Sequence, residues 1–115
     1  MTDCLFCRIV AGEIPATVVA VSERALAFRD IAPKAPTHVL VIPKTHYDNA
    51  AEMAAADPQL AGEMLALAGE VAAKEGVAAD GYRLMFNTGA HGGQEVFHAH
   101  LHVLGGKPLG PMLAA

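Results

Sequence analysis

The chain has 115 residues, 53% of them hydrophobic and 17% charged, with a formal net charge of −4. This length suits one compact domain over residues 1–115, and the apolar content excludes intrinsic disorder as the main state. The negative charge argues against a general nucleic-acid-binding surface. The N-terminus lacks the basic and apolar regions of a secretory signal, and the most apolar stretch, 39–43, is too short to cross a bilayer. We therefore expect a cytoplasmic protein that does not bind membranes.

The first half of the chain predicts a short helix followed by three strands. The helix covers Cys4 to Ala11 and ends at Gly12. β-branched residues predict a strand over Val18–Val21, and a second strand over Ala25–Asp30 would form a hairpin with it. The stretch His38–Ile42 is almost continuously apolar, so we expect it to be a central strand.

The second half predicts one long helix and two strands. Asp57 is a good N-cap for a helix that ends at Gly76, and its apolar residues repeat at spacings of four, three and four. Strands are predicted over Tyr82–Asn87 and Val96–Leu104. Because strands outnumber helices and neighbours in sequence can pair, the predicted fold class is α+β. It contains an antiparallel sheet, one long helix and a short N-terminal helix.

Three histidines alternate in the last predicted strand: His98, His100 and His102. Side chains alternate across a strand, so we expect all three imidazoles on one face. They could be exposed on an edge strand or could bind a catalytic zinc ion. They could also provide a nucleophile for attack at phosphorus, since a neutral imidazole is a competent nucleophile near pH 7.

The surroundings of these histidines favour phosphoryl chemistry. The loop before them contains Gly89, Gly92 and Gly93, and glycines let backbone N–H groups approach an anion closely. Asp30 ends a predicted strand in an apolar context, where its carboxylate could accept hydrogen bonds from a ribose diol. An Asx turn before Pro33 is the alternative role of Asp30.

The two cysteines, Cys4 and Cys7, form a C-x-x-C motif. The motif is compatible with a redox pair, with half of a zinc site that needs two further ligands, or with two cysteines packing as small hydrophobic residues. The residues themselves leave these three interpretations open.

The segment from His98 to Leu104 resembles the signature of the histidine-triad (HIT) superfamily, His-φ-His-φ-His-φφ, where φ is apolar. Residues 6–15, 27–31 and 36–44 are similar to other stretches of that family, and residues 92–97 and 104–112 resemble its bacterial Hint branch. The resemblance implies a two-fold homodimer with a HIT-like fold that hydrolyses the P–N bond of purine nucleoside phosphoramidates of the adenylyl-amine or adenylyl-lysine type. The alternatives are a dinucleoside polyphosphate hydrolase or nucleotidyl transferase, and a purine-nucleotide-binding interaction module.

The resemblance also implies catalytic roles for four histidines. His100 would attack the α-phosphorus and form a covalent nucleotidyl-histidine. His98 would orient His100 through its carbonyl or its ring. His102 and His38 would contact the phosphate and the leaving group.

The substrate-binding residues are implied in the same way. Asp30 would accept the ribose hydroxyls, and Asn87 would lie near the 5′ oxygen and the phosphate. The backbone N–H groups of Glu95 and Val96 would hold the phosphoryl oxygens. Serine is frequent in the family at the position of Glu95, so the carboxylate departs from the pattern and could attract a cationic leaving group or face solvent. The base pocket would consist of Phe6, Phe28, Ile31 and Leu40.

Some members of the superfamily with a similar C-x-x-C motif hold structural zinc, and the matching ligands here are Cys4, Cys7, His46 and His98. Such a set satisfies tetrahedral zinc. As a ligand, His98 would stiffen the segment under His100 rather than face substrate. The resemblance implies no cofactor for the chemistry itself, and the expected partners are purine nucleoside monophosphates and phosphoramidates and a second copy of the chain.

Overall fold

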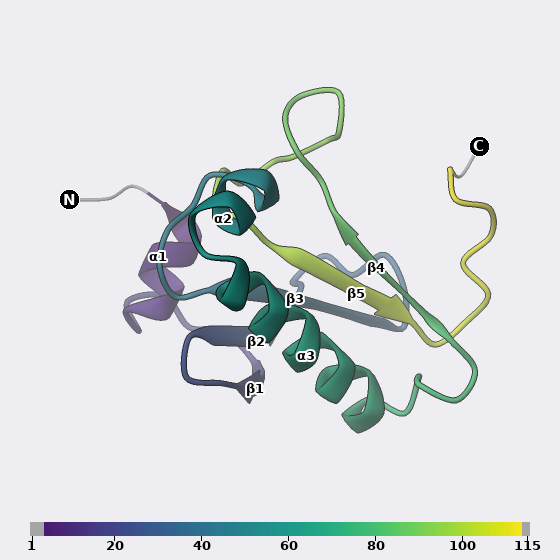
Figure 1. The fold of residues 1–115 in the computed structure, drawn as a ribbon. Helices are drawn as coiled ribbons and strands as arrows, with labels where there is room; N and C mark the ends of the chain where they lie inside the picture. Colours follow the sequence, from purple (N-terminus) through teal and green to yellow (C-terminus); the bar gives the residue numbers. More distant parts are fainter. Residues whose placement is uncertain (1–3, 114–115) are drawn as a thin grey trace.

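The computed structural model describes residues 4–113, which form a five-stranded antiparallel sheet and three helices (Figure 1). The strand order is β1-β2-β3-β5-β4, so the predicted α+β class is confirmed. Within this part of the chain, every helix is too short or too polar to cross a membrane. The elements are α1 (Leu5–Val10), β1 (Val18–Val21), β2 (Ala25–Arg29), β3 (Thr37–Pro43), α2 (Ala50–Ala56), α3 (Pro58–Lys74), β4 (Tyr82–Phe86) and β5 (Leu101–Gly105).

The central strand is β3, which pairs with β2 on one side and β5 on the other. All seven of its residues are buried, as the continuous apolar run predicts. Val39 and Val41 belong to the main core, whereas Leu40 and Ile42 belong to a second cluster. Since side chains alternate along a strand, these two clusters lie on opposite faces of the sheet.

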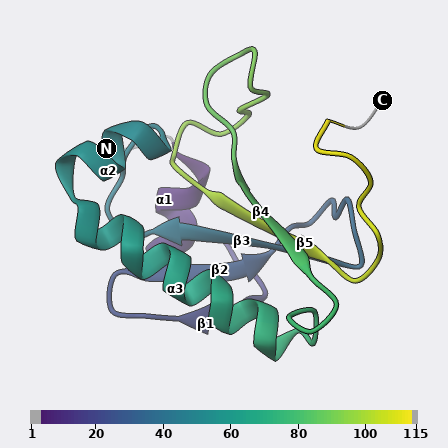
Figure 2. The ribbon, with the colours of Figure 1, turned by 45° about the vertical axis from the view of Figure 1, so that its right-hand side comes forward.

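Helix α3 runs across the face of the sheet that holds the main core (Figures 1 and 2). It begins where the sequence predicts, because the Asp57 carboxylate accepts a hydrogen bond of 3.1 Å from the backbone N–H of Leu60. Gly76 follows it with a positive φ of 76°, the conformation that ends helices. The repeating apolar residues are buried: Leu60, Met64, Leu67 and Val71.

The prediction of one long and one short helix was incomplete, because α2 is a third helix. Asn49 is its N-cap, and the side chain of Asn49 accepts a hydrogen bond of 2.9 Å from the N–H of Glu52. Polar residues at the N-cap and at the third helical position are a helix-start pattern. The sequence therefore contained the signal.

The predicted start of the last strand at Val96 was wrong, since β5 begins at Leu101. The preceding backbone bonds elsewhere: the N–H of Ala99 donates to the carbonyl of Tyr47 at 2.7 Å. His98 and His100 therefore lie in the segment before β5, and only His102 of the three lies in the strand. The connection between β4 and β5 projects beyond the end of the sheet (Figure 1).

Candidate functional site

A pocket of about 400 Å³ lies on the face of the sheet opposite α3, between α1 and the segment before β5. It brings together most of the expected substrate-site residues, from five separate parts of the chain. Its walls also include Gly93 of the predicted glycine loop and residues that the sequence analysis missed, among them Leu5, Ile9 and Ile14. The expected residues that line it are Phe6, Phe28, Asp30, Ile31, Leu40, Asn87, Glu95, Val96, His100 and His102.

The inner end of the pocket is apolar. Phe6 and Phe28 meet edge to face with ring centroids 5.5 Å apart, and both are buried together with Leu40. Ile31 differs from this group because 99% of its surface is exposed, so it lies at the rim and forms no buried wall. An apolar slot of this kind can take a planar ring, as ligand pockets with few polar groups do.

The backbone orients the ring of His100 in the pocket. Its Nδ1 lies 2.8 Å from the carbonyl oxygen of His98. A carbonyl oxygen can only accept, so Nδ1 carries a proton, and in the neutral ring the lone pair is on Nε2. The ring is 7% exposed and meets the edge of Phe6 at a centroid distance of 5.1 Å. The hydrogen bond at Nδ1 thus directs Nε2 of His100 away from the backbone of His98.

A second pair of histidines forms a directed hydrogen-bond chain. The N–H of Lys34 donates to Nδ1 of His38 at 3.0 Å, so the proton of His38 is on Nε2. That Nε2–H donates to Nδ1 of His102 at 2.9 Å. The proton of His102 is therefore on its Nε2, which is buried and finds no acceptor within residues 4–113. Burial of His102, together with the neighbouring His100 and His38, lowers its pKa to about 4, so it is neutral near pH 7.

His38 lies behind the pocket rather than in its wall. It is buried, it does not line the pocket, and burial lowers its pKa. Its Nε2 is 3.4 Å from Oδ2 of Asp30. The other carboxylate oxygen of Asp30 accepts from the N–H of Ala32 at 2.8 Å, so the Asx turn is present and Asp30 also lines the pocket. His38 therefore contacts His102 and does not line the pocket.

The segment before His98 is held by Gln94, which the sequence analysis missed. Its side-chain NH₂ donates to the carbonyls of Asp48 and Val96 at 2.7 and 3.0 Å, and its Oε1 accepts from the N–H of Gly89 at 2.9 Å. Across the described residues, the N–H groups of Glu95 and Val96 have no acceptor. Two adjacent N–H groups at a pocket wall are suited to an anion.

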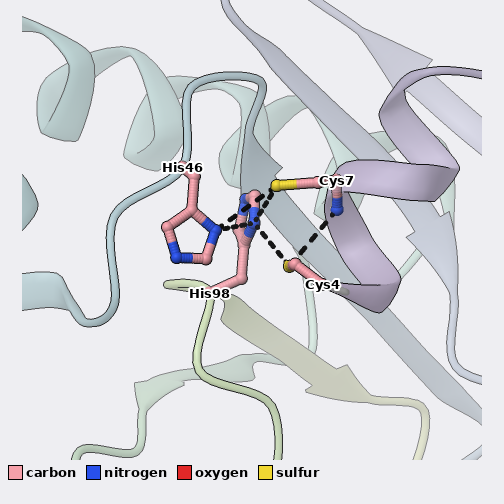
Figure 3. Close-up of side chains that lie close together, drawn as sticks. All are labelled: Cys4, Cys7, His46 and His98. Carbon is pink, nitrogen blue, oxygen red and sulfur yellow. Dashed lines mark hydrogen bonds between the residues drawn. The ribbon is translucent and has the colours of Figure 1, made fainter. Parts of the chain in front are cut away.

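Four further side chains meet beside the pocket: Cys4, Cys7, His46 and His98 (Figure 3). Nδ1 of His98 lies 3.3 Å from Sγ of Cys4 and 3.5 Å from Sγ of Cys7. Nδ1 of His46 lies 3.3 Å from Sγ of Cys7 and 3.2 Å from Nδ1 of His98. Tetrahedral zinc with nitrogen and sulfur ligands separates these atoms by about 3.3–3.8 Å, so the set is close to the spacing that the metal requires.

The outer nitrogens of both histidines support this fit. Nε2 of His98 donates to the carbonyl of Pro43 at 2.8 Å, and Nε2 of His46 donates to Oδ1 of Asp48 at 2.9 Å. Each inner Nδ1 therefore keeps a lone pair that faces the cysteines. Metal-ligating histidines usually have their second nitrogen held in this way. His98 is fully buried and lies in this cluster, not in the pocket wall.

A second group of convergent side chains, Asp30, His38 and His102, has a metal-like composition but fits a metal poorly. Because the N–H of Lys34 occupies Nδ1 of His38, the nitrogen that faces the group carries a proton. A protonated nitrogen has no lone pair for a metal. This group is better described as a hydrogen-bond chain.

The sequence and the fold both match known proteins. A family model described as the HIT domain matches residues 11–109. The purine nucleoside phosphoramidase of Escherichia coli K12 is 48% identical over 112 residues, which cover 97% of this chain and 94% of that protein. A HIT family hydrolase from Clostridium thermocellum superposes with a TM-score of 0.94 at 42% identity, covering 99% of each chain. One from Legionella pneumophila gives 0.90 at 50% identity, covering 94% of this chain and 96% of that one.

Proposed function

Since this chain belongs to the HIT domain family and is a hydrolase, we propose that it cleaves the P–N bond of purine nucleoside phosphoramidates of the adenylyl-amine or adenylyl-lysine type. The nucleophile is Nε2 of His100. The observation that carries this assignment is the hydrogen bond from Nδ1–H of His100 to the carbonyl of His98, which makes Nε2 the nitrogen with the lone pair in the neutral ring, at the wall of the pocket. Purine nucleoside phosphoramidase is the name of the Escherichia coli relative.

The pocket supports a specific placement of the nucleotide. The base enters the slot between Phe6, Phe28 and Leu40, and the ribose hydroxyls donate to the carboxylate of Asp30. Asn87 lies along the wall towards the phosphate. The phosphoryl oxygens accept from the N–H groups of Glu95 and Val96, which have no protein acceptor in the described residues. Ile31 lies at the rim of the pocket.

The reaction has two displacement steps at the α-phosphorus. The lone pair on Nε2 of His100 attacks phosphorus, and the P–N bond to the leaving amine breaks as that nitrogen takes up a proton from solvent. A nucleotidyl-histidine results. Water then attacks the same phosphorus, the bond to Nε2 breaks, and the proton from water returns to solvent with release of the nucleoside monophosphate.

His102 donates from Nε2–H to the phosphoryl group, and the hydrogen bond from His38 holds it in that tautomer. A donor that is already oriented costs no reorganisation as charge develops on phosphate oxygen. His38 thus acts through His102, while His98 acts through its carbonyl on His100.

A structural zinc ion at Cys4, Cys7, His46 and His98 is part of the proposal. It would fasten α1 to the segment that carries His100 and would supply no chemistry. The cysteines are not joined in a disulfide, as is usual for thiolate ligands in the reducing cytoplasm, where we place the protein.

We also propose a two-fold homodimer. The strand β4 is at the edge of the sheet, so its outer backbone groups are available to a second chain. Tyr82 is exposed on this strand at 38%. Sedimentation equilibrium tests the proposal: twice the chain mass of 11.9 kDa supports it, and a monomer at all concentrations contradicts it.

The test of the catalytic proposal is His100→Ala. We expect turnover of adenosine 5′-phosphoramidate to fall by at least 10³-fold while AMP still binds, because the pocket walls remain. Rapid-quench mass spectrometry of the wild type should detect a chain carrying one adenylyl group. Unchanged turnover in the variant would reject His100 as the nucleophile. Faster cleavage of a diadenosine polyphosphate than of the phosphoramidate by the wild type would reject the substrate class.

A further inference from the structure

The helix α1 carries residues of both the metal cluster and the pocket. Cys4 is its N-cap and Cys7 lies one turn later, and both belong to the cluster. Leu5, Phe6 and Ile9 from the same helix line the pocket. The two sites therefore share one short helix.

We propose that this arrangement couples the two sites: metal bound by the cluster raises the affinity of the pocket for nucleotide, and Phe6 and His98 transmit the effect. The inference rests on the proposed function for the presence of a nucleotide in the pocket. It goes beyond that function because it assigns the cysteines a role in substrate binding as positioning residues.

The attachment of α1 to the rest of the chain is the first argument. The helix has six residues, and helices this short are unstable without tertiary contacts. Its backbone hydrogen bonds are local and reach from Cys4 to Glu13 only. In the described part of the chain, the polar contacts from α1 to the sheet side run through Cys4 and Cys7 to His46 and His98. Ligation by a metal would make these contacts rigid.

The ring of Phe6 is the second argument, because it touches both sites. Phe6 is 5% exposed and lies between the two cysteines in the sequence. Its centroid is 5.9 Å from the ring of His98, a cluster residue, and 5.1 Å from the ring of His100, a pocket residue. It also meets Phe28 edge to face at 5.5 Å, so the two rings together form the apolar inner end of the pocket. A displacement of α1 moves the ring of Phe6 and changes the shape of this inner end.

The backbone of His98 provides a second connection. The ring of His98 is fixed by the cluster on one side and by the carbonyl of Pro43 on the other. Its own carbonyl accepts from Nδ1 of His100. Loosening of the His98 ring therefore reaches the nucleophile through the Cβ, the Cα and the carbonyl group of His98 and one hydrogen bond.

Coupling between two binding sites is reciprocal. If zinc raises the affinity for AMP by a given factor, AMP raises the affinity for zinc by the same factor. We expect a factor of roughly 5 to 20, within the range that is common for coupled sites.

The experiment measures both sides of this linkage on the full chain, with zinc and AMP as the probes. Calorimetry gives the AMP Kd of metal-free and zinc-loaded protein, and competition with a chromogenic chelator gives the zinc Kd with and without AMP. Far-UV circular dichroism verifies that the metal-free protein is folded. A measurement that needs no metal-free protein is the visible spectrum of the cobalt-loaded chain, which we expect to shift when AMP binds.

Two variants separate transmission from pocket loss. Phe6→Leu leaves all four ligands and the His98 connection in place, and we expect it to lower the coupling factor to less than half of its wild-type value while zinc still binds. Leu5→Ala is the matched control, because Leu5 lines the pocket from the same helix without an aromatic ring. We expect it to weaken AMP binding while the coupling factor stays at its wild-type value.

The outcomes distinguish this inference from the proposed function. Zinc and AMP that both bind, each with an affinity independent of the other, overturn the coupling alone, as does full coupling in Phe6→Leu. Failure of AMP to bind either form overturns the nucleotide site together with the coupling. Equal, reciprocal factors that fall in Phe6→Leu and stay at the wild-type value in Leu5→Ala support it.

Discussion

At the scale of single residues, backbone oxygens and N–H groups decide what each imidazole can do. A carbonyl holds the outer nitrogen of His98 and leaves its inner nitrogen bare for a metal. A backbone N–H does the opposite for His38 and leaves the proton facing His102. The same residue type is therefore suited to metal ligation, to nucleophilic attack or to hydrogen-bond donation according to one backbone contact.

The charge of Glu95 gives a prediction at this scale. Two carboxylates, Asp30 and Glu95, line a pocket that we propose for an anionic phosphate. Glu95 is exposed. Like charges in water repel each other by about 1 kcal/mol at short range. We expect Glu95→Gln to tighten AMP binding about two- to fivefold in low salt, measured by calorimetry.

The effect in Glu95→Gln should shrink as salt is added, since screening weakens exposed charges. Glu23→Gln is the control, because it makes the same change in net charge at an exposed turn that does not line the pocket. An equal gain in both variants would show that net charge, not the position of Glu95, is responsible.

The residues that the sequence made visible are those whose type is unusual for their surroundings. Three alternating histidines and a carboxylate after an apolar strand stand out in one dimension, and the structure places His100, His102 and Asp30 at one pocket. Gln94 does not stand out, because its role depends on burial and on three backbone partners far apart in the chain. A sequence pattern carries no information on such contacts.

At the scale of elements, the connection between β4 and β5 has one position where only glycine fits. A Cβ on Gly92 would lie 2.5 Å from the carbonyl oxygen of Thr88. We expect Gly92→Ala to displace this connection and, with it, the N–H groups of Glu95 and Val96. Phosphoramidate turnover should fall about 10- to 100-fold, as when a charge-stabilising donor is lost, in steady-state assays on folded protein.

Gly62→Ala is the matched control for Gly92→Ala. Gly62 lies within α3 and has open space around its Cβ position. Alanine favours helix over glycine by about 1 kcal/mol, so the control should raise the melting temperature and leave turnover unchanged. Normal turnover in Gly92→Ala would contradict the role of this connection.

Prediction of the elements succeeded where local signals agreed and failed where tertiary contacts prevailed. The N-cap at Asp57 and the apolar repeat fixed α3. The start of β5 was wrong because the alternation continues through Ala99, whose N–H bonds Tyr47 instead of a neighbouring strand. The helix α2 was missed although Asn49 and Glu52 give a local start signal.

At the scale of the whole molecule, buried neutral histidines give stability a pH dependence. Burial lowers the pKa of His38 and His98 from 6.5, and that of His102 to about 4. In an unfolded chain these groups take up protons near pH 6.5, so below that value the unfolded state binds more protons than the folded one. The contribution of these neutral histidines to the free energy of unfolding is then fully present above pH 6.5 and is lost as the pH falls towards about 4.

We expect the melting temperature to decrease steadily between pH 6.5 and about 4. For His102 alone, the difference between the pKa values of the unfolded and folded chain corresponds to about 3 kcal/mol of unfolding free energy. Calorimetric scans of the wild type and of His102→Asn test this, because the variant should lose part of the dependence. A melting temperature that is constant over this range would contradict the assignment of neutral, buried histidines.

The sequence by itself did not predict which residues far apart in the chain lie close together in the fold. Cys4 and His98 are separated by 94 positions, and their contact at 3.3 Å follows from the strand order and from the packing of α1. Spacing alone left the C-x-x-C motif with three interpretations. Only the resemblance to a family joined it to His46 and His98, because a shared fold carries information on distance that a single sequence lacks.

The burial of β3 on both faces has a consequence for denaturation. Val39 and Val41 are part of the main core, while Leu40 lines the pocket on the other side of the same strand. A slip of one position in register would exchange the two sets. Packing of the main core and formation of the pocket therefore occur in one cooperative transition. In a urea titration, nucleotide binding and ellipticity should be lost at the same midpoint.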